Sequence, residues 1–158
     1  MKPQKIIFLD FDGVLINRNS LAMHSGLSAQ ADPDCVKALN RITDATGARI
    51  VVSSSWRLSI SDKEVAYLLK SWGVTGEFIG TTPIIYQTTK LGDLMVHTSR
   101  SDEIGSWLKK HRYDQFVIID DDGGDIAYKH NLVQTKFEIG LTEELADEAI
   151  EILNGDRR

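Results

Sequence analysis

The stretch that decides the fold reads Ile6-Ile7-Phe8-Leu9-Asp10-Phe11-Asp12-Gly13-Val14-Leu15. Four apolar residues run without interruption up to Asp10, and Asp12 and Gly13 follow at once. An apolar run of this length that ends at a turn is typical of a strand buried on both faces of a parallel sheet. Because ligands of open α/β sheets bind beyond the carboxyl ends of the strands, this strand delivers Asp10 and Asp12 to the usual place of chemistry.

Two carboxylates so close together need a physical reason. Like charges about 4 Å apart repel each other by roughly 4 kcal/mol at an effective dielectric constant near 20. A divalent cation removes this cost, and Mg²⁺ prefers hard oxygen ligands. A carboxylate can also act as a nucleophile and form an aspartyl-phosphate. The alternative is an ordinary Asp-Gly turn in which Asp12 is solvated.

Length and composition indicate one globular domain that covers residues 1–158, with 42% hydrophobic and 26% charged residues. No apolar run is long enough to predict a membrane span. The net charge of −5 argues against an extended nucleic-acid-binding surface. Cys35 is the single cysteine, so no internal disulfide can form and we expect a reducing, cytoplasmic environment.

Strand and helix patterns alternate along the chain. Capping residues and apolar spacing predict a helix that ends at Gly47, a second that ends at Gly73, a third opened by Ser101 and Asp102, and a last one capped by Thr142. We expect residues 17–33 to form a loop with a short helical piece, and residues 80–98 to be irregular. Buried or edge strands are predicted at residues 6–9, 49–53, 78–79, 116–119 and 132–135. This alternation predicts an α/β fold, a doubly wound three-layer sandwich around a mainly parallel sheet.

Three of the predicted strands end in polar clusters, which a parallel sheet would bring to one edge. Asp120 and Asp121, in an Asp-Asp-Asp-Gly-Gly stretch, would complete a Mg²⁺ site with Asp10; alone they would be a solvated turn. Serines after Val52 offer hydroxyl and backbone N–H groups to a phosphoryl oxygen. Arg100 stands just before a helix and is one candidate cation for the site, and Lys90 is the other. The three clusters are Asp10/Asp12, Ser53/Ser54/Ser55 and Asp120/Asp121/Asp122.

Together these residues resemble the haloacid dehalogenase superfamily of phosphotransferases. The superfamily has an Asp-x-Asp motif, a Ser or Thr at the end of the second strand, a Lys or Arg before a later helix, and a final acidic pair. All four occur here in that order, between residues 10 and 121. Finer details are similar to the small branch named for Swiss-army-knife RNA repair proteins: Ser53-Ser54-Ser55-Trp56-Arg57, Arg100-x-x-Glu103-Ile104-x-x-Trp107-Leu108 and Asp120-Asp121.

The resemblance implies a role for each matched residue. Asp10 would attack phosphorus, and Asp12 would protonate the leaving oxygen and then activate water. Ser54, or else Ser53, would bind the phosphoryl group, and Arg100 would neutralise developing charge. Asp10, Asp120 and Asp121 would hold Mg²⁺, with the backbone carbonyl of Phe11 or Asp12. The second acid, Asp12, favours phosphate chemistry over cleavage of a carbon–halogen bond.

Neither place where this superfamily inserts a cap domain is long enough here for a large one. An open site would admit a phosphorylated small molecule or a nucleic-acid end. Trp56 and Arg57 could stack on a base or pair with phosphate. The alternative, which we favour, has Trp56 packed under its loop and Arg57 on the surface.

The sequence therefore predicts a Mg²⁺-dependent phosphatase that acts on phosphate monoesters through an aspartyl-phosphate. A receiver domain of a signalling system is also α/β, with a phosphorylated aspartate, but it would not turn over phosphate esters. A phosphate-binding module without activity is a third reading. Asp12 beside Asp10 argues against both alternatives.

Overall fold

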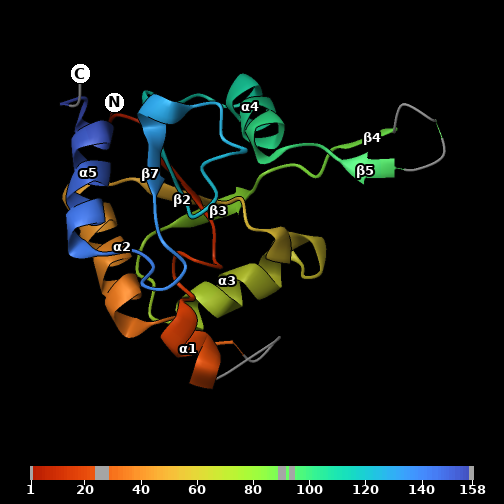
Figure 1. The fold of residues 1–158 in the computed structure, drawn as a ribbon. Coiled ribbons are helices and arrows are strands. Elements are labelled where there is room, and N and C mark those ends of the chain that lie inside the picture. Colours follow the sequence, from red (N-terminus) through yellow and green to blue (C-terminus); the bar gives the residue numbers. More distant parts are fainter. Residues whose placement is uncertain (1, 24–28, 89–91, 93–94, 157–158) are drawn as a thin grey trace.

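The computed structural model describes residues 2–23, 29–88, 92 and 95–156. Its centre is a five-stranded sheet, parallel throughout, with the strand order β3-β2-β1-β6-β7 (Figure 1). The strands are β1 (Lys5–Leu9), β2 (Arg49–Val52), β3 (Phe78–Thr81), β6 (Gln115–Asp120) and β7 (Leu132–Gln134). The helices of the described chain are α1 (Arg18–Met23), α2 (Pro33–Thr46), α3 (Asp62–Ser71), α4 (Arg100–Lys110) and α5 (Glu143–Asn154).

The register of the three central strands brings their polar ends together. Leu9 of β1 pairs with Val52 of β2 on one side and with Ile119 of β6 on the other. The next residue of each strand is Asp10, Ser53 or Asp120, so these three side chains follow the same row of the sheet. Since β1 lies between β2 and β6, the chain reverses its direction of winding at this strand, which is where such folds bind ligands.

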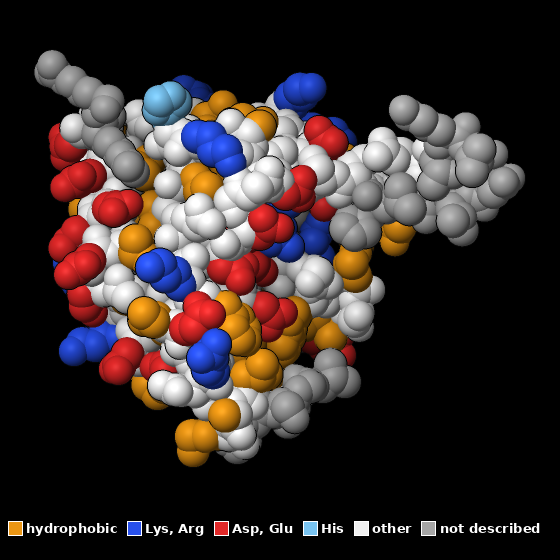
Figure 2. Space-filling view, viewed as in Figure 1, with side chains coloured by type: hydrophobic (Ala, Val, Ile, Leu, Met, Phe, Trp, Pro, Cys, Tyr) orange, Lys and Arg blue, Asp and Glu red, His pale blue; other side chains and the backbone are white. Residues whose placement is uncertain are grey.

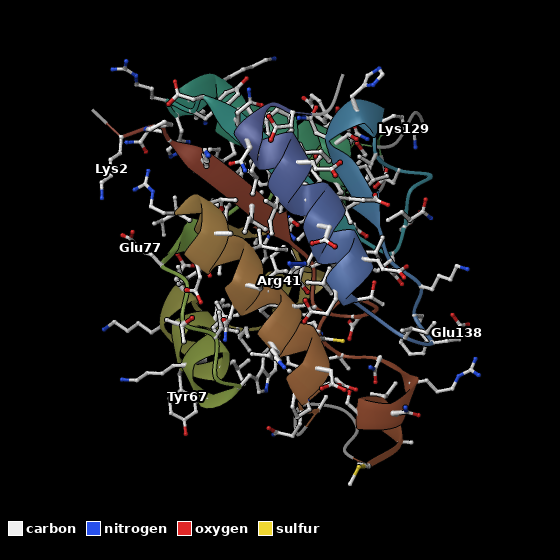
Figure 3. All side chains as sticks on the ribbon, turned by 90° about the vertical axis from the view of Figure 1, so that its left-hand side faces the viewer. Lys2, Arg41, Tyr67, Glu77, Lys129 and Glu138 are labelled. Carbon is white, nitrogen blue, oxygen red and sulfur yellow. The ribbon has the colours of Figure 1, made fainter. Side chains whose placement is uncertain are left out.

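Alternate residues of β1 pack against different helices. Ile7 and Leu9 belong to a core that α2, α3 and α5 cover, whereas Ile6 and Phe8 belong to a core that α4 covers. Figure 3 shows α2 and α5 side by side, with Arg41 of α2 between them. The fold is thus the predicted doubly wound α/β sandwich, and the residues that the structure describes form no evident cap domain.

Capping side chains set where the helices begin. The carboxylate of Asp32 accepts a hydrogen bond from the Asp34 amide before Pro33 opens α2. Ser61 and Glu64 form a capping box at the start of α3. Helix α4 begins one residue earlier than the sequence predicted, because the hydroxyl of Ser99 caps it by accepting from the amide of Asp102.

The expectation of irregular structure between residues 80 and 98 was wrong in part. Two short strands, β4 (Tyr86–Thr88) and β5 (Met95–His97), pair antiparallel in this stretch. Figure 1 shows this hairpin projecting away from the body of the protein. Strands of three residues carry too little apolar alternation to be recognised in a sequence.

Candidate active site

Asp10 is held at the carboxyl end of β1, and its side chain is fixed by two partners. The residue is only 5% exposed. Its Oδ1 accepts a hydrogen bond of 2.8 Å from the amide of Phe11. Its Oδ2 accepts one of 3.1 Å from the Arg100 guanidinium, which reaches the site from the first residue of α4. A carboxylate fixed in this way is preorganised for one direction of approach.

Asp120 and Asp121 lie beside Asp10, at the end of the neighbouring strand β6. Asp120 is fully buried, and its Oδ2 accepts a hydrogen bond of 2.6 Å from the same Arg100 nitrogen that contacts Asp10. Its Oδ1 accepts one of 2.9 Å from the amide of Asp122. Carboxylate oxygens of Asp10, Asp120 and Asp121 all lie within 4.8 Å of one another. Figure 2 shows acidic side chains gathered near the middle of one face, with hydrophobic side chains exposed next to them.

The crowded carboxylates change the pKa values of the site. Burial raises the pKa of Asp10 to about 7; Arg100 opposes this shift and Asp120 adds to it. Burial and the neighbouring Asp120 also raise the pKa of Asp121. Burial alone would lower the pKa of the Arg100 guanidinium, but Asp10 and Asp120 together raise it. One cation therefore balances only part of the negative charge, and the site gains by binding another cation.

The donor set fits Mg²⁺. Carboxylate oxygens are the hard ligands that this ion prefers, and those of Asp10, Asp120 and Asp121 lie within 4.8 Å of one another. The Phe11 carbonyl already accepts the amides of Val14, Leu15 and Ile16. Among the described residues no backbone amide donates to the carbonyl of Asp12, which leaves this oxygen as the better candidate ligand.

Gly13 makes room for the acidic pair. Its φ angle of +79° lies in the left-handed region that favours glycine. A Cβ at this position would stand 2.3 Å from Oδ2 of Asp121. The turn after β1 can therefore hold only glycine while Asp121 keeps its place.

The carboxylate of Asp12 is outside this cluster and has a different partner. Its Oδ2 accepts a hydrogen bond of 3.0 Å from the indole Nε1 of Trp56. Trp56 packs edge to face against Phe11 and Trp72, as expected for a side chain under its loop. The two aspartates of the first motif are thus held by separate groups, which suits two separate roles.

The three serines after β2 have different environments. Ser54 caps the 3₁₀ helix η2 (Ser55–Leu58), and its hydroxyl accepts a hydrogen bond from the Trp56 amide. Ser53 is fully buried, and its hydroxyl has no hydrogen-bond partner among the described residues. A buried hydroxyl without a partner is costly in a protein interior, which makes Ser53 the better candidate to meet a phosphoryl oxygen. Ser55 is exposed.

Arg57 was expected on the surface, and this expectation was wrong. The side chain is buried and forms an ion pair with Glu103 of α4, which is also buried. It also donates to the carbonyls of Ser53, Ser54 and Thr82. The guanidinium therefore joins the serine loop, the end of β3 and helix α4. The position of Arg57 beside the serines in the sequence gave no sign of this burial. Glu103 was named only as part of the motif that carries the family resemblance, and the sequence did not indicate that it pairs with Arg57.

Arg100 is one of the two cations that the sequence offered for this site, and it lies within the carboxylate cluster. Its guanidinium places a permanent positive charge beside the carboxylates of Asp10 and Asp120. The rival, Lys90, lies outside the described residues.

Comparison with known families agrees with this geometry. The sequence model for the HAD domain in Swiss Army Knife RNA repair proteins matches residues 6–146. The chain belongs to this haloacid dehalogenase family. Membership supports hydrolase or phosphatase activity in general terms, and HAD domains generally use Mg²⁺. No curated protein matches the chain. Within its described residues, none of this HAD domain's helices has the length and apolar character needed to cross a bilayer.

Proposed function

We propose that this HAD domain is a Mg²⁺-dependent phosphatase that hydrolyses phosphate monoesters through an aspartyl-phosphate. One observation carries the proposal. Asp10 lies buried between an arginine and two further carboxylates, while Asp12 is held apart from that cluster by Trp56. This arrangement supplies a fixed nucleophile and a separate group for proton transfer.

In the first step a carboxylate oxygen of Asp10 attacks phosphorus. The bond between phosphorus and the ester oxygen breaks, and the ester oxygen takes a proton from Asp12. In the second step a water molecule attacks the phosphorus of the aspartyl-phosphate and gives a proton to the Asp12 carboxylate. The bond from phosphorus to Asp10 then breaks, inorganic phosphate leaves, and both aspartates return to their starting states.

The other residues of the site stabilise charge. Arg100 contacts Asp10 and would neutralise the negative charge that develops on the phosphoryl oxygens. The hydroxyl of Ser53, which has no partner among the described residues, would donate to one of these oxygens. Asp10, Asp120, Asp121 and the carbonyl of Asp12 would hold Mg²⁺. When bound, Mg²⁺ would draw the phosphoryl group and the nucleophile together by neutralising both.

The proposed substrate is a phosphorylated molecule that can enter a site without a cap. The family takes its name from RNA repair proteins, so a phosphorylated nucleotide or RNA end is a suitable candidate. A receiver-like role would also use a phosphorylated aspartate, but it would not need Asp12 as a second acid for proton transfer. A silent phosphate-binding module would have no need for a nucleophile and a proton donor held apart.

The direct test is turnover of p-nitrophenyl phosphate. We expect release of phosphate with Mg²⁺, loss of activity with EDTA, and loss of nearly all activity in Asp10→Asn, because an amide cannot form the acyl-phosphate. Equal rates with and without metal would contradict the metal site. A stable phospho-aspartate without turnover would instead favour the receiver-like role.

A further inference from the structure

A pocket of about 410 Å³ opens beside Asp12. Trp56, Leu21 and Ile60 give it apolar walls, and Ala29 adds a buried apolar surface. Its other described lining residues are Asp12, Ser55 and Ser59. The pocket is distinct from the carboxylate cluster, because its described lining residues do not include Asp10, Asp120 or Asp121.

We propose that this pocket is the leaving-group subsite and that it takes the nucleoside of a terminal phosphorylated nucleotide. The inference rests on the proposed function, in which Asp12 protonates the ester oxygen that leaves. The leaving group must therefore extend from phosphorus on the side of Asp12 rather than on the side of the carboxylate cluster. Among the described residues, Asp12 belongs to this pocket and accepts the indole N–H of one of its walls.

The walls favour a neutral, flat group. Trp56 can stack on an aromatic ring, and Leu21 and Ile60 add apolar contact. No lysine or arginine stands among the described lining residues, so nothing there would bind a second phosphate of a sugar bisphosphate. The hydroxyls of Ser55 and Ser59 can form hydrogen bonds with the hydroxyls of a ribose.

The volume of the pocket favours a nucleoside over a ligand with a single ring. A cavity of about 150 Å³ already holds benzene. The pocket beside Asp12, at about 410 Å³, exceeds what a phenol needs and lies within the usual range of small-molecule sites. A base joined to a ribose fits this description better than the phenol of phosphotyrosine or the chain of glycerol phosphate.

The experiment compares kcat/KM for adenosine 3′- and 5′-monophosphate, an RNA oligonucleotide with a terminal phosphate, phosphotyrosine and glycerol 2-phosphate. We expect one of the nucleotides to exceed phosphotyrosine and glycerol 2-phosphate. The Ile60→Ser variant removes apolar contact and should lower kcat/KM for that nucleotide about tenfold. Ile139→Ser is the matched control, because Ile139 is exposed and lines a different pocket. The oligonucleotide arm decides whether the nucleoside comes from a free nucleotide or from an RNA end.

A binding measurement keeps the inference separate from the proposed function. Adenosine alone should bind the intact protein in a calorimetric titration, and Ile60→Ser should weaken that binding about tenfold while Ile139→Ser does not. Adenosine binding with no turnover of any ester would contradict the proposed phosphatase function but support the assignment of the pocket to a nucleoside. The pocket assignment would be overturned by any of three results: equal kcat/KM for all leaving groups, a higher kcat/KM for phosphotyrosine than for the nucleotides, or no binding of adenosine.

Discussion

The indole Nε1 of Trp56 donates a 3.0 Å hydrogen bond to Oδ2 of Asp12, although the two residues lie on different loops of the sheet edge. One carboxylate of the first motif thus has a partner of its own, outside the cluster that contains Asp10. If Asp12 transfers the proton as proposed, the indole fixes where that proton is delivered. We infer that Trp56 is a positioning residue, which holds Asp12 without touching the reacting atoms.

Replacing Trp56 by Phe keeps an aromatic ring and removes this donor. A poorly held proton donor matters most when the leaving group needs a proton. We therefore expect kcat to fall about tenfold for an alkyl phosphate and much less for p-nitrophenyl phosphate. The ratio of the two rates is the measurement. Trp72→Phe is the control, because the Trp72 Nε1 has no hydrogen-bond partner among the described residues. If both variants change the ratio equally, Trp56 acts only through packing.

The buried pair of Arg57 and Glu103 should be essential for stability. Glu103→Gln would leave the guanidinium of Arg57 charged in a site where water cannot reach it. Breaking one partner of such a pair typically costs about 3–5 kcal/mol of unfolding free energy. Denaturant unfolding of the variant would measure this loss.

An exposed pair provides the comparison. Arg41 of α2 and Glu143 of α5 form an ion pair, and their side chains are 40% and 56% exposed. Glu143→Gln should cost at most about 1 kcal/mol, as is usual for surface pairs. Equal losses in the two variants would mean that Arg57 finds other compensation, for example from the carbonyls that surround it.

These contacts mark the limit of what the sequence could predict. The apolar run of β1 and the polar residues after Leu9, Val52 and Ile119 were enough to predict the sheet and to bring Asp10 and Asp120 to one edge. Strand register follows from hydrophobic pattern, which is a local property that a sequence displays.

The partners of individual side chains were not predictable in the same way. Arg57 looked like a surface residue because arginine is usually exposed, and its burial depends on Glu103, which lies on another element. The sequence also could not show that the hydroxyl of Ser54, rather than that of Ser53, caps η2. Such details arise from tertiary contacts that no local pattern records.

The raised pKa of Asp10 predicts how the stability of the metal-free protein depends on pH. An unfolded aspartate loses its proton near pH 3.8, whereas the folded one, because of burial, keeps it to about 7. Between these values the folded state holds a proton that the unfolded state has lost. This group's contribution to the free energy of unfolding is therefore complete below the lower value, falls as pH rises through the window, and is lost above about 7.

Thermal unfolding in EDTA across this window would measure the effect. Asp10→Asn cannot titrate, so the difference in melting temperature between the variant and the parent protein should grow with pH and then level off. A difference in melting temperature that stays constant across this pH range would show that the pKa of Asp10 is not raised in the folded protein. With metal present, Mg²⁺ competes with the proton, so its apparent affinity should rise with pH until about 7.

The last prediction concerns the acidic strand end. If Asp121 shares Mg²⁺ with Asp10 and Asp120, its replacement by Asn should raise the Mg²⁺ concentration needed for half-maximal activity. The same change removes one of three carboxylates whose oxygens lie within 4.8 Å of one another. Relief of this repulsion should leave the melting temperature of the metal-free protein level or higher. Asp122→Asn is the matched control, because Asp122 lies outside the cluster and its Oδ1 accepts from the amide of Gly124. Mg²⁺ dependence that is unchanged in Asp121→Asn, or changed equally in Asp122→Asn, would reduce this acidic stretch to a solvated turn after β6.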